Sequence, residues 1–541
     1  MRISFEGVSW RKQFVLDIIR RLGIIAKISD SKQSELVLVC NANEKKVKEM
    51  IDHAKNGASV IFLQPQQTVL KLFGSELMYT YHFPLMQINY DSIPVTFLQT
   101  FPPISLIKQK YGENYANFAY DFSVSGENYT TKYPAIAWKD IGSGKICVFL
   151  YDFVATVLLL LQGWEFFTSE GNLTPKLKKG ISRALHLADN LINSQLSEIP
   201  QAFFHELVLL DIIRKMFESK GPVPRIWYYP FPYTNVLLLN GDSDNLEKKK
   251  LEKSWDFLVK NHLPYTMYTM VDDITKFSTH QLHYWMDKGI DFGFHYFAGQ
   301  SPSPEVMFKH LIDSRKIFLS KKVEFVSCRG HSLIWVGWDS QIKIMQDAQL
   351  CYSSNLLYWE PGVSYGFPYY LYTSAGKSTV QELQVFTSDD INLFNKSGRL
   401  PSKSDVYGRK LIAWLDVNQK LYYQPLNPIF HPHYMFSQQN TSEIILQIAS
   451  YAKSSGIPVM NHKMFFKWWE KRQNIKLDYQ FNDDHIEFSG MIADDIGIAI
   501  SEKWQNKKIP ETIKLEGTKE ILFSTKSGKI FLKRRHSEKK F

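Results

Sequence analysis

The chain has 541 residues, more than one hydrophobic core usually supports, so we expect several domains. Hydrophobic residues make up 44% of the sequence and charged residues 22%, a balance typical of folded globular proteins that excludes a disordered chain. The net charge of +10 comes from scattered basic runs without an organised aromatic stripe, which argues against nucleic-acid binding and favours a solvated surface.

Cysteine spacing and the N-terminal sequence indicate a reducing compartment. The four cysteines form no CxxC pair and lack zinc-finger spacing, so a thiol-based metal site is not expected. Residues 1–14 lack the apolar stretch and cleavage site of a secretory signal. The most apolar segment, 146–161, is interrupted by Asp152 and is too short to span a bilayer. We therefore expect a cytoplasmic protein without a transmembrane segment, and its oligomeric state stays open.

Residues 1–165 alternate between helical and extended patterns. Alternation of this kind predicts a parallel sheet covered by helices, which makes this region a flavodoxin-like α/β domain. The predicted helices are 12–22, 44–56 and 153–161, and the predicted strands are 35–40, 59–63 and 145–151. Residues 142–145 read Gly-Ser-Gly-Lys, but they lack the first glycine of a phosphate loop and precede a strand, so we interpret them as a hairpin turn.

Three further regions follow along the chain. Residues 166–224 have helical spacing with a break at Pro200 and are interpreted as a helical connector. From 225 to 473, short strand-like runs alternate with helices, which predicts a (β/α) barrel with an insertion of shorter strands near 355–425. Residues 474–541 contain short alternating runs, so a small β-rich appendage is expected there.

Two carboxylates follow the first strand of the predicted barrel. The run 236–239 is apolar, and Asp242 and Asp244 come directly after it. Active sites of such barrels lie at the carboxyl ends of the strands. One carboxylate there can hold a divalent metal while the other removes a proton from water. An Asx-turn followed by a helix cap would explain the same pair of residues.

Histidines and an arginine follow later strands of the predicted barrel. His295 ends one strand, Arg329 and His331 end the next, and His431 and His433 stand in a His-Pro-His group after a late strand. Any one of these histidines alone is more simply a buried, hydrogen-bonded residue. Their occurrence at successive strand ends favours a shared site.

These strand-end motifs resemble those of the polysaccharide deacetylase superfamily, the NodB-type homology fold. The motifs that carry the resemblance are an acidic pair, Gly-x-His, Arg-x-His followed by Trp335, and His-Pro. They extend over about residues 225–472. The preceding α/β domain is similar to the non-catalytic, glutamine-amidotransferase-like domains of some deacetylase-like barrels.

The resemblance implies roles for the strand-end residues. It makes Asp242 the general base, Asp244 and His295 metal ligands, Arg329 the group that orients the base, and His431 the general acid. Water activated by the metal would attack an N-acetyl or O-acetyl carbonyl. Trp335, Tyr296 and His433 are candidate substrate-binding residues.

One position departs from the family pattern. The second metal histidine usually lies four residues after the first, and this chain has Gly299 there. We expect His331 to replace it, with His433 as the reserve, because two protein ligands would be incomplete for zinc, the expected metal. Otherwise the metal is weakly bound or absent.

The leading interpretation is a metal-dependent hydrolase that removes acetyl or other acyl groups from a polysaccharide or glycan precursor. The alternative is a catalytically inactive barrel that binds a saccharide or assembles with other proteins of glycan biosynthesis, which the missing histidine favours. A glycoside hydrolase is less favoured, because two acids two residues apart on one strand end are poorly placed on opposite sides of a sugar ring.

Overall fold

In the computed structural model the chain forms two compact units. Unit 1 comprises residues 1–160, 193–232 and 472–541, and unit 2 comprises 161–192 and 233–471. The structure describes all residues except 75–76, 79–84, 89–92, 102–103, 109, 120–129, 164–195, 197, 300–302, 357–364, 387–389, 391–400, 438–439, 483–484, 507–511, 528 and 535–541. No helix in the described part of the chain is long and apolar enough to cross a membrane.

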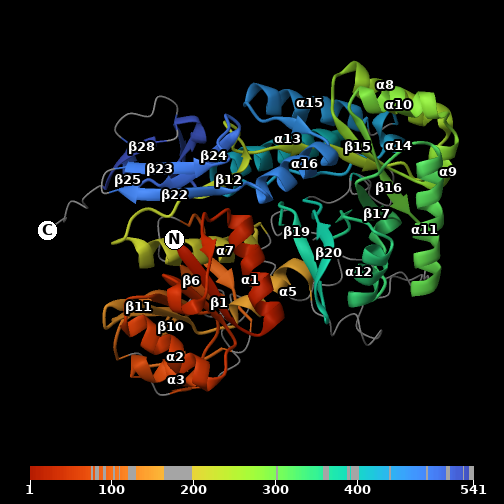
Figure 1. Ribbon diagram of the computed structural model, residues 1–541. Coiled ribbons are helices and arrows are strands. Elements are labelled where there is room, and N and C mark those ends of the chain that lie inside the picture. The colour runs from red at the N-terminus through yellow and green to blue at the C-terminus, as the bar shows by residue number, and fades with distance from the viewer. Residues whose placement is uncertain are drawn as a thin grey trace. The chain divides into compact units, whose positions relative to one another are not determined.

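Unit 1 contains a nine-stranded sheet with helices, coloured red to orange in Figure 1. Its strand order is β2-β1-β3-β4-β11-β10-β9-β6-β7, and the first five strands are parallel. The bounds are β1 Arg2–Gly7, β2 Lys27–Ile28, β3 Leu36–Cys40, β4 Ser59–Phe62, β6 Leu85–Ile88, β7 Phe97–Gln99, β9 Glu113–Ala119, β10 Thr130–Ile141, β11 Gly144–Phe149, α1 Ser9–Leu22, α2 Glu44–Lys55, α5 Phe153–Gln162 and α7 Gln201–Phe217. The alternation predicted from the sequence is confirmed, and residues 142–145 form the turn between antiparallel β10 and β11.

The start of the predicted connector lies outside the described residues. Within the connector, α7 follows Pro200, where the sequence predicted a break. The likeness of residues 1–165 to an amidotransferase domain stays a prediction.

The C-terminal strands of unit 1 share a hydrophobic cluster with the N-terminal part of the same unit. The cluster joins Ile25 and Ile226 to buried residues such as Ile486, Ile498 and Phe523. These strands form two four-stranded sheets, β12-β24-β27-β26 and β22-β23-β28-β25. Their bounds are β12 Arg225–Pro230, β22 Leu477–Asn482, β23 His485–Gly490, β24 Ile496–Ser501, β25 Trp504–Asn506, β26 Ile513–Leu515, β27 Glu520–Ser524 and β28 Lys529–Arg534.

Unit 2 is organised around the seven-stranded sheet β14-β15-β16-β17-β18-β20-β19. Neighbouring strands from β14 to β20 are parallel, and only β19 pairs in antiparallel fashion. The bounds are β14 Asn240–Asp242, β15 Tyr265–Thr269, β16 Ile290–Tyr296, β17 Ser327–Gly330, β18 Tyr352–Ser353, β19 Tyr369–Thr373 and β20 Gly376–Glu382. A separate parallel pair joins β13, Leu237–Leu238, to β21, Val459–Met460. Closure of these strands into a barrel stays a prediction.

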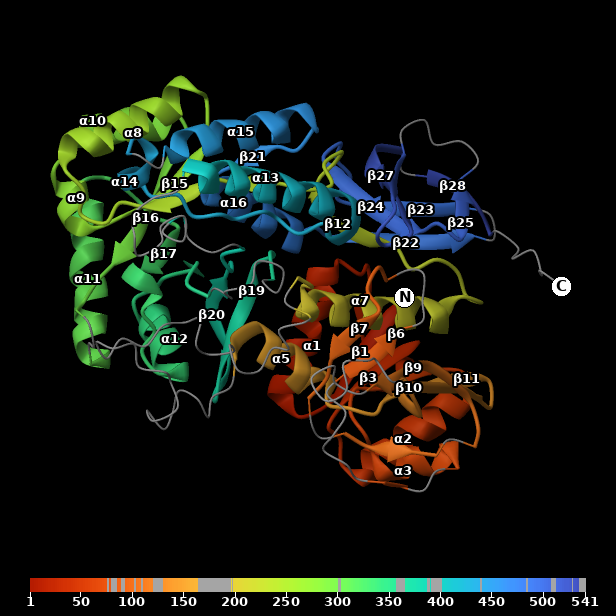
Figure 2. The same ribbon diagram turned by 180° about the vertical axis from the view of Figure 1, so that it is seen from behind.

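Helices flank this sheet, and Figures 1 and 2 show α8, α10 and α11 along the outside of β15 and β16. Their amphipathic sequences explain this placement, since α8 buries Leu251, Trp255 and Leu258 and exposes its lysines. The bounds are α8 Lys248–Lys260, α9 Val271–Thr275, α10 Thr279–Asp287, α11 Pro304–Ser320, α12 Trp338–Asp347, α13 Pro401–Val417, α14 Pro432–Met435, α15 Thr441–Ser454 and α16 His462–Gln473.

The segment near 355–425 differs from the expected insertion. Its strand β20 pairs in parallel with β18 and so continues the main sheet. Five of the seven residues of β20 are buried, which suits a strand that lies between two neighbouring strands inside a covered sheet.

Candidate metal centre

The parallel register of unit 2 brings the predicted site residues to one edge of the sheet. Asp242 ends β14 and pairs with Tyr268 of β15, and that residue pairs with Gly293 of β16. Farther along β16, His295 pairs with Arg329 of β17. Residues that pair directly across neighbouring strands point to the same face, which accounts for the proximity of the imidazole and the guanidinium group.

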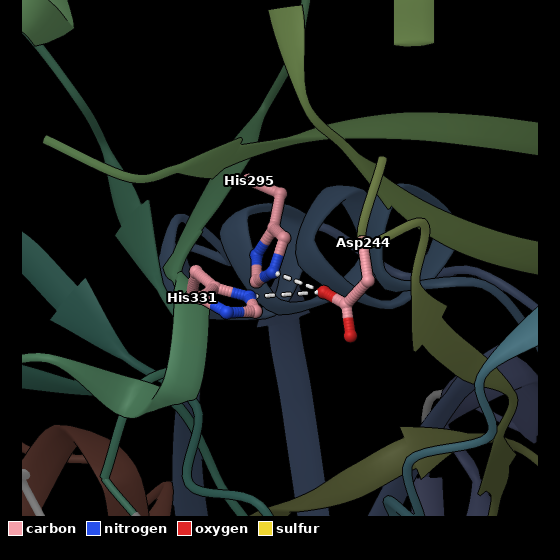
Figure 3. A group of neighbouring side chains, drawn as sticks. All are labelled: Asp244, His295 and His331. Atoms are coloured by element: carbon pink, nitrogen blue, oxygen red, sulfur yellow. Dashed lines mark hydrogen bonds and ion pairs between the residues drawn. The ribbon is translucent and has the colours of Figure 1, made fainter. Parts of the chain in front are cut away.

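Asp244, His295 and His331 converge on one point, as Figure 3 shows. Asp244 Oδ1 lies 3.0 Å from His295 Nε2 and 3.1 Å from His331 Nδ1. One potential ligand atom from each residue lies within 4.8 Å of the other two. His295 is buried, whereas 30% of the His331 side chain is exposed. A carboxylate and two imidazoles at this spacing can bind one divalent metal ion.

The second ring nitrogen of His295 fixes how that imidazole points. His295 Nδ1 lies 3.1 Å from the carbonyl oxygen of Arg329 and donates to it, since a carbonyl oxygen only accepts. This bond directs Nε2 toward Asp244, and in the neutral ring Nε2 keeps its lone pair for a metal. A backbone carbonyl behind the ligand nitrogen is a common feature of histidine metal sites.

The surroundings of the triad favour the charged forms of both Asp244 and His295. Burial alone would raise the pKa of Asp244, but hydrogen bonds from His295 and His331 hold that pKa well below its usual range. Burial alone would lower the pKa of His295, but the carboxylates of Asp242 and Asp244 raise it above its usual value. A bound cation would take the place of the imidazole proton, because ligation requires the neutral ring.

Asp242 is held beside the triad by Arg329. Its Oδ1 accepts a hydrogen bond of 2.9 Å from Arg329 Nη1, and its Oδ2 lies 3.9 Å from His295 Nε2. Arg329 is fully buried, donates twice to Ser354 at 2.8 and 2.9 Å, and lies 4.1 Å above the ring of Tyr268. The guanidinium group is therefore fixed, and one oxygen of Asp242 remains directed at the site.

His431 reaches the same cluster from the start of α14. Its Nε2 lies 3.4 Å from Asp244 Oδ2 and 4.0 Å from Asp242 Oδ2. Its Nδ1 lies 2.6 Å from Asp390 Oδ1, and its backbone N–H donates to Asp390 Oδ2 at 2.9 Å. Asp390 could not be selected from the sequence, because it lies in a segment without a periodic pattern. Its contact with His431 in the structure is what identifies it.

The three candidate substrate-binding residues differ in exposure and in their partners. Trp335 is 3% exposed, and Tyr296 is fully buried with its hydroxyl donating to Asn355 Oδ1. Successive side chains of a strand point to opposite faces, so the inward direction of His295 turns Tyr296 away. A direct contact of Tyr296 with a saccharide would need the ring to move. His433 is exposed, with its ring 5.0 Å from that of Tyr434.

Two further positions lie on the loop after β16. Gly299 has φ of 103°, and a Cβ built there would meet no atom within 4 Å, so the position expected from the resemblance to carry a second histidine is bordered by open space. Phe297, which sequence analysis did not select, is 36% exposed and packs edge-to-face on His331 with ring centroids 5.0 Å apart. Its ring forms an apolar wall against the partly exposed His331 imidazole.

No protein-family model matches the chain, and no curated protein matches it. Among solved structures, it is similar to Agd3, described as a novel carbohydrate deacetylase, with 8% identity over 98% of each chain and a TM-score of 0.37. A protein from Mycobacterium smegmatis described as a polysaccharide deacetylase has 14% identity over 47% of this chain and 94% of its own, with a TM-score of 0.37. A family 4 carbohydrate esterase from Streptomyces lividans has 10% identity over 42% of this chain and 91% of its own, with a TM-score of 0.28. Similarity at this level does not assign an activity to this chain.

Proposed function

We propose that unit 2 is a metal-dependent hydrolase that removes acetyl or other acyl groups from a polysaccharide or glycan precursor. The observation that carries this proposal is the convergence of Asp244, His295 and His331 beside Asp242 and His431. A metal triad, a carboxylate and an imidazole in one cluster are groups that metal-dependent acyl hydrolysis uses. The carbohydrate substrate is inferred from the resemblance of the strand-end motifs to those of polysaccharide deacetylases.

The triad fits a divalent metal. Asp244, His295 and His331 supply one oxygen and two nitrogen ligands, the number and type that catalytic zinc sites use. Bound there, the metal would polarise the acyl carbonyl and stabilise the negative charge that develops on its oxygen.

The remaining residues would move protons. Asp242 would accept a proton from the attacking water on Oδ2, because its Oδ1 is occupied by Arg329. His431 would donate a proton to the departing nitrogen or oxygen as the bond to the acyl carbon breaks. Asp390, bonded to Nδ1 of His431, would keep Nε2 as the atom that donates. The products are the carboxylic acid and the free amine or hydroxyl group.

Metal analysis together with acetate release tests this proposal. The purified chain should contain a divalent metal and release acetate from one or more members of a panel of N-acetylated and O-acetylated oligosaccharides. Asp242→Asn should abolish acetate release while metal content persists, since Asp242 is not one of the three ligands. A wild-type chain reconstituted with Zn²⁺ that releases no acetate from the whole panel would contradict the hydrolase.

The open position at Gly299 favours a second candidate, an inactive barrel that binds a saccharide. That protein would bind one of the same oligosaccharides without metal and without releasing acetate. Saccharide binding in the presence of a chelator, together with no acetate release from the Zn²⁺-reconstituted chain, would favour this second candidate.

A further inference from the structure

Asn355, just past the end of β18, joins the two strand ends that carry the histidines of the triad. Its Oδ1 accepts the backbone N–H of Gly330 at 2.7 Å, directly before His331. The same oxygen accepts the hydroxyl of Tyr296 at 3.3 Å, directly after His295. One buried side chain therefore contacts the backbone directly before His331 and the side chain of the residue directly after His295.

The Asn355 side chain is itself fixed. It is fully buried, and its Nδ2 donates to Ser353 Oγ at 2.7 Å. The backbone N–H groups of Asn355 and Leu356 both donate to Glu382 Oε1 at 2.7 Å. Because Gly330 N–H can only donate, the amide cannot turn over without placing its own donor against that group. The amide therefore has one favourable orientation.

Packing adds to this restraint. A Cβ at Gly330 would lie 2.9 Å from the ring of Tyr296, so the β17 backbone contacts this ring as closely as a glycine permits. The Tyr296 hydroxyl also accepts a hydrogen bond of 3.1 Å from Gln341 Nε2. The ring thus fills the space between the two strand ends instead of reaching solvent.

His331 depends on this arrangement more than His295 does. His295 is buried and has a second anchor, its Nδ1 bond to the carbonyl of Arg329. His331 is partly exposed, and the next residue, Ser332, has φ of 55°, in the left-handed region that favours glycine. Besides its contacts with Asp244 and Phe297, its position depends on the backbone at Gly330.

We propose that Asn355 is a positioning residue for the metal triad, holding the backbone at Gly330 so that the His331 imidazole meets Asp244 and His295. This inference rests on the proposed metal site. It requires no contact of Asn355 with substrate or metal. Loss of hydrogen bonds that orient ligands typically weakens metal affinity by about 10- to 100-fold.

The test measures affinity of the full-length chain for Zn²⁺ by chelator competition and records the visible spectrum with Co²⁺. Asn355→Leu keeps side-chain size and should weaken Zn²⁺ binding by about 10- to 100-fold. The Co²⁺ bands should lose intensity as a protein ligand is lost. The matched control is Asn418→Leu, a fully buried asparagine whose Nδ2 donates to Trp414 O in the preceding helix α13. The control should leave affinity and spectrum unchanged.

A coupling experiment separates positioning from a general loss of structure. In a His331→Ala background, Asn355→Leu should weaken Zn²⁺ binding by much less than it does in the wild type, since the ligand it positions is already gone. Tyr296→Phe removes only one hydroxyl and should cause a smaller loss, less than about 10-fold. This milder variant keeps the proposal testable if Asn355→Leu does not fold.

The outcomes distinguish this inference from the proposed function. If the wild type binds Zn²⁺ and both Asn355→Leu and Tyr296→Phe bind it equally well, the positioning role is wrong while the metal site stands. An equal loss in the wild-type and His331→Ala backgrounds would also overturn it. If the wild type binds neither Zn²⁺ nor Co²⁺, the metal site and the positioning role both fail.

Discussion

At the scale of single residues, the site contains two sets of side chains. One set would contact the proposed metal, and the other orients the residues proposed to transfer protons. His331 Nδ1 and His295 Nε2 both face Asp244, whereas Arg329 and Asp390 contact Asp242 and His431 from behind. Substitutions in the two sets should therefore separate binding of the metal from the transfer of protons.

His331 is the residue whose removal tests the metal site most directly. His331→Ala should weaken Zn²⁺ affinity by at least about 100-fold, more than typical losses of supporting hydrogen bonds, because one of three protein ligands is lost. Chelator competition measures the change. His433→Ala is the matched control, since His433 is exposed and should leave the affinity unchanged. Equal affinity in both variants would exclude His331 as a ligand.

Asp390 tests the role of His431 as a proton donor. Asp390→Asn should lower the rate of acetate release by about 100-fold or more, because an amide holds the imidazole less firmly and does not stabilise its protonated form. Metal affinity should stay within about threefold, since the His331 and Asp244 contacts are untouched. Steady-state rates with matched metal content measure the effect. A variant with wild-type rates would show that the Asp390 contact is only structural.

At the scale of elements, the sequence predicted those residues of the cluster that lie at the ends of parallel strands, and it did not predict the others. Asp242, Asp244, His295 and His331 each lie at or just after the end of a parallel strand, and parallel strands end at one edge of a sheet. Asp390 and Asn355 escaped prediction, because their contacts join segments distant in sequence and neither residue belongs to a motif. The motif alone did not predict the direction of the Tyr296 side chain. Successive side chains of a strand point to opposite faces, so Tyr296 points away from the face of His295.

Gly241 in β14 shows a close approach that the sequence did not reveal. A Cβ on Gly241 would lie 1.6 Å from Phe430 O and 2.4 Å from the hydroxyl of Tyr265. Gly241→Ala should therefore force the strand end apart and destabilise unit 2 by about 3 kcal/mol or more, as severe overpacking does. The adjacent Asp242 would move with it. Chemical denaturation measures the loss, and Gly456→Ala is the control.

The control variant Gly456→Ala should lose less stability than Gly241→Ala. A Cβ at Gly456 would meet no atom within 4 Å, but φ is 70°, so alanine there should cost only about 1–2 kcal/mol of backbone strain. Equal losses in the two variants would show that space around Gly241 is not limiting.

At the scale of the whole molecule, unit 1 is built from three separate stretches of chain, and a buried ion cluster connects two of them. Glu520, at the start of β27, accepts from Arg225 Nε and Nη2 at 2.8 and 2.6 Å. Arg214 of α7 also bonds to Glu520. Glu520 and Arg225 are fully buried, so each charge depends on its partners. These ion pairs connect the C-terminal strand β27 to Arg214 and Arg225, which are distant from it in sequence.

Removing the charge of Glu520 should therefore destabilise unit 1 at neutral pH. Glu520→Gln keeps the shape but leaves two arginines without a carboxylate, at a cost of about 3–5 kcal/mol in free energy of unfolding. Denaturant unfolding followed by the fluorescence of the intact chain measures the difference. Glu502→Gln, on a partly exposed residue whose ion pair with Lys514 spans 3.7 Å, is the control and should cost less than about 1 kcal/mol.

The pH dependence of that difference identifies the charge as its cause. Burial alone would raise the pKa of Glu520, but Arg214 and Arg225 lower it from 4.5 to about 2. A carboxylate with a lowered folded-state pKa contributes stability that is present above its unfolded pKa and lost as the pH falls through its folded pKa. The gap between wild type and Glu520→Gln should therefore be full above pH 4.5 and shrink toward pH 2. A gap that stayed constant over this range would mean that glutamine disrupts packing at this position, with no contribution from the ion pair.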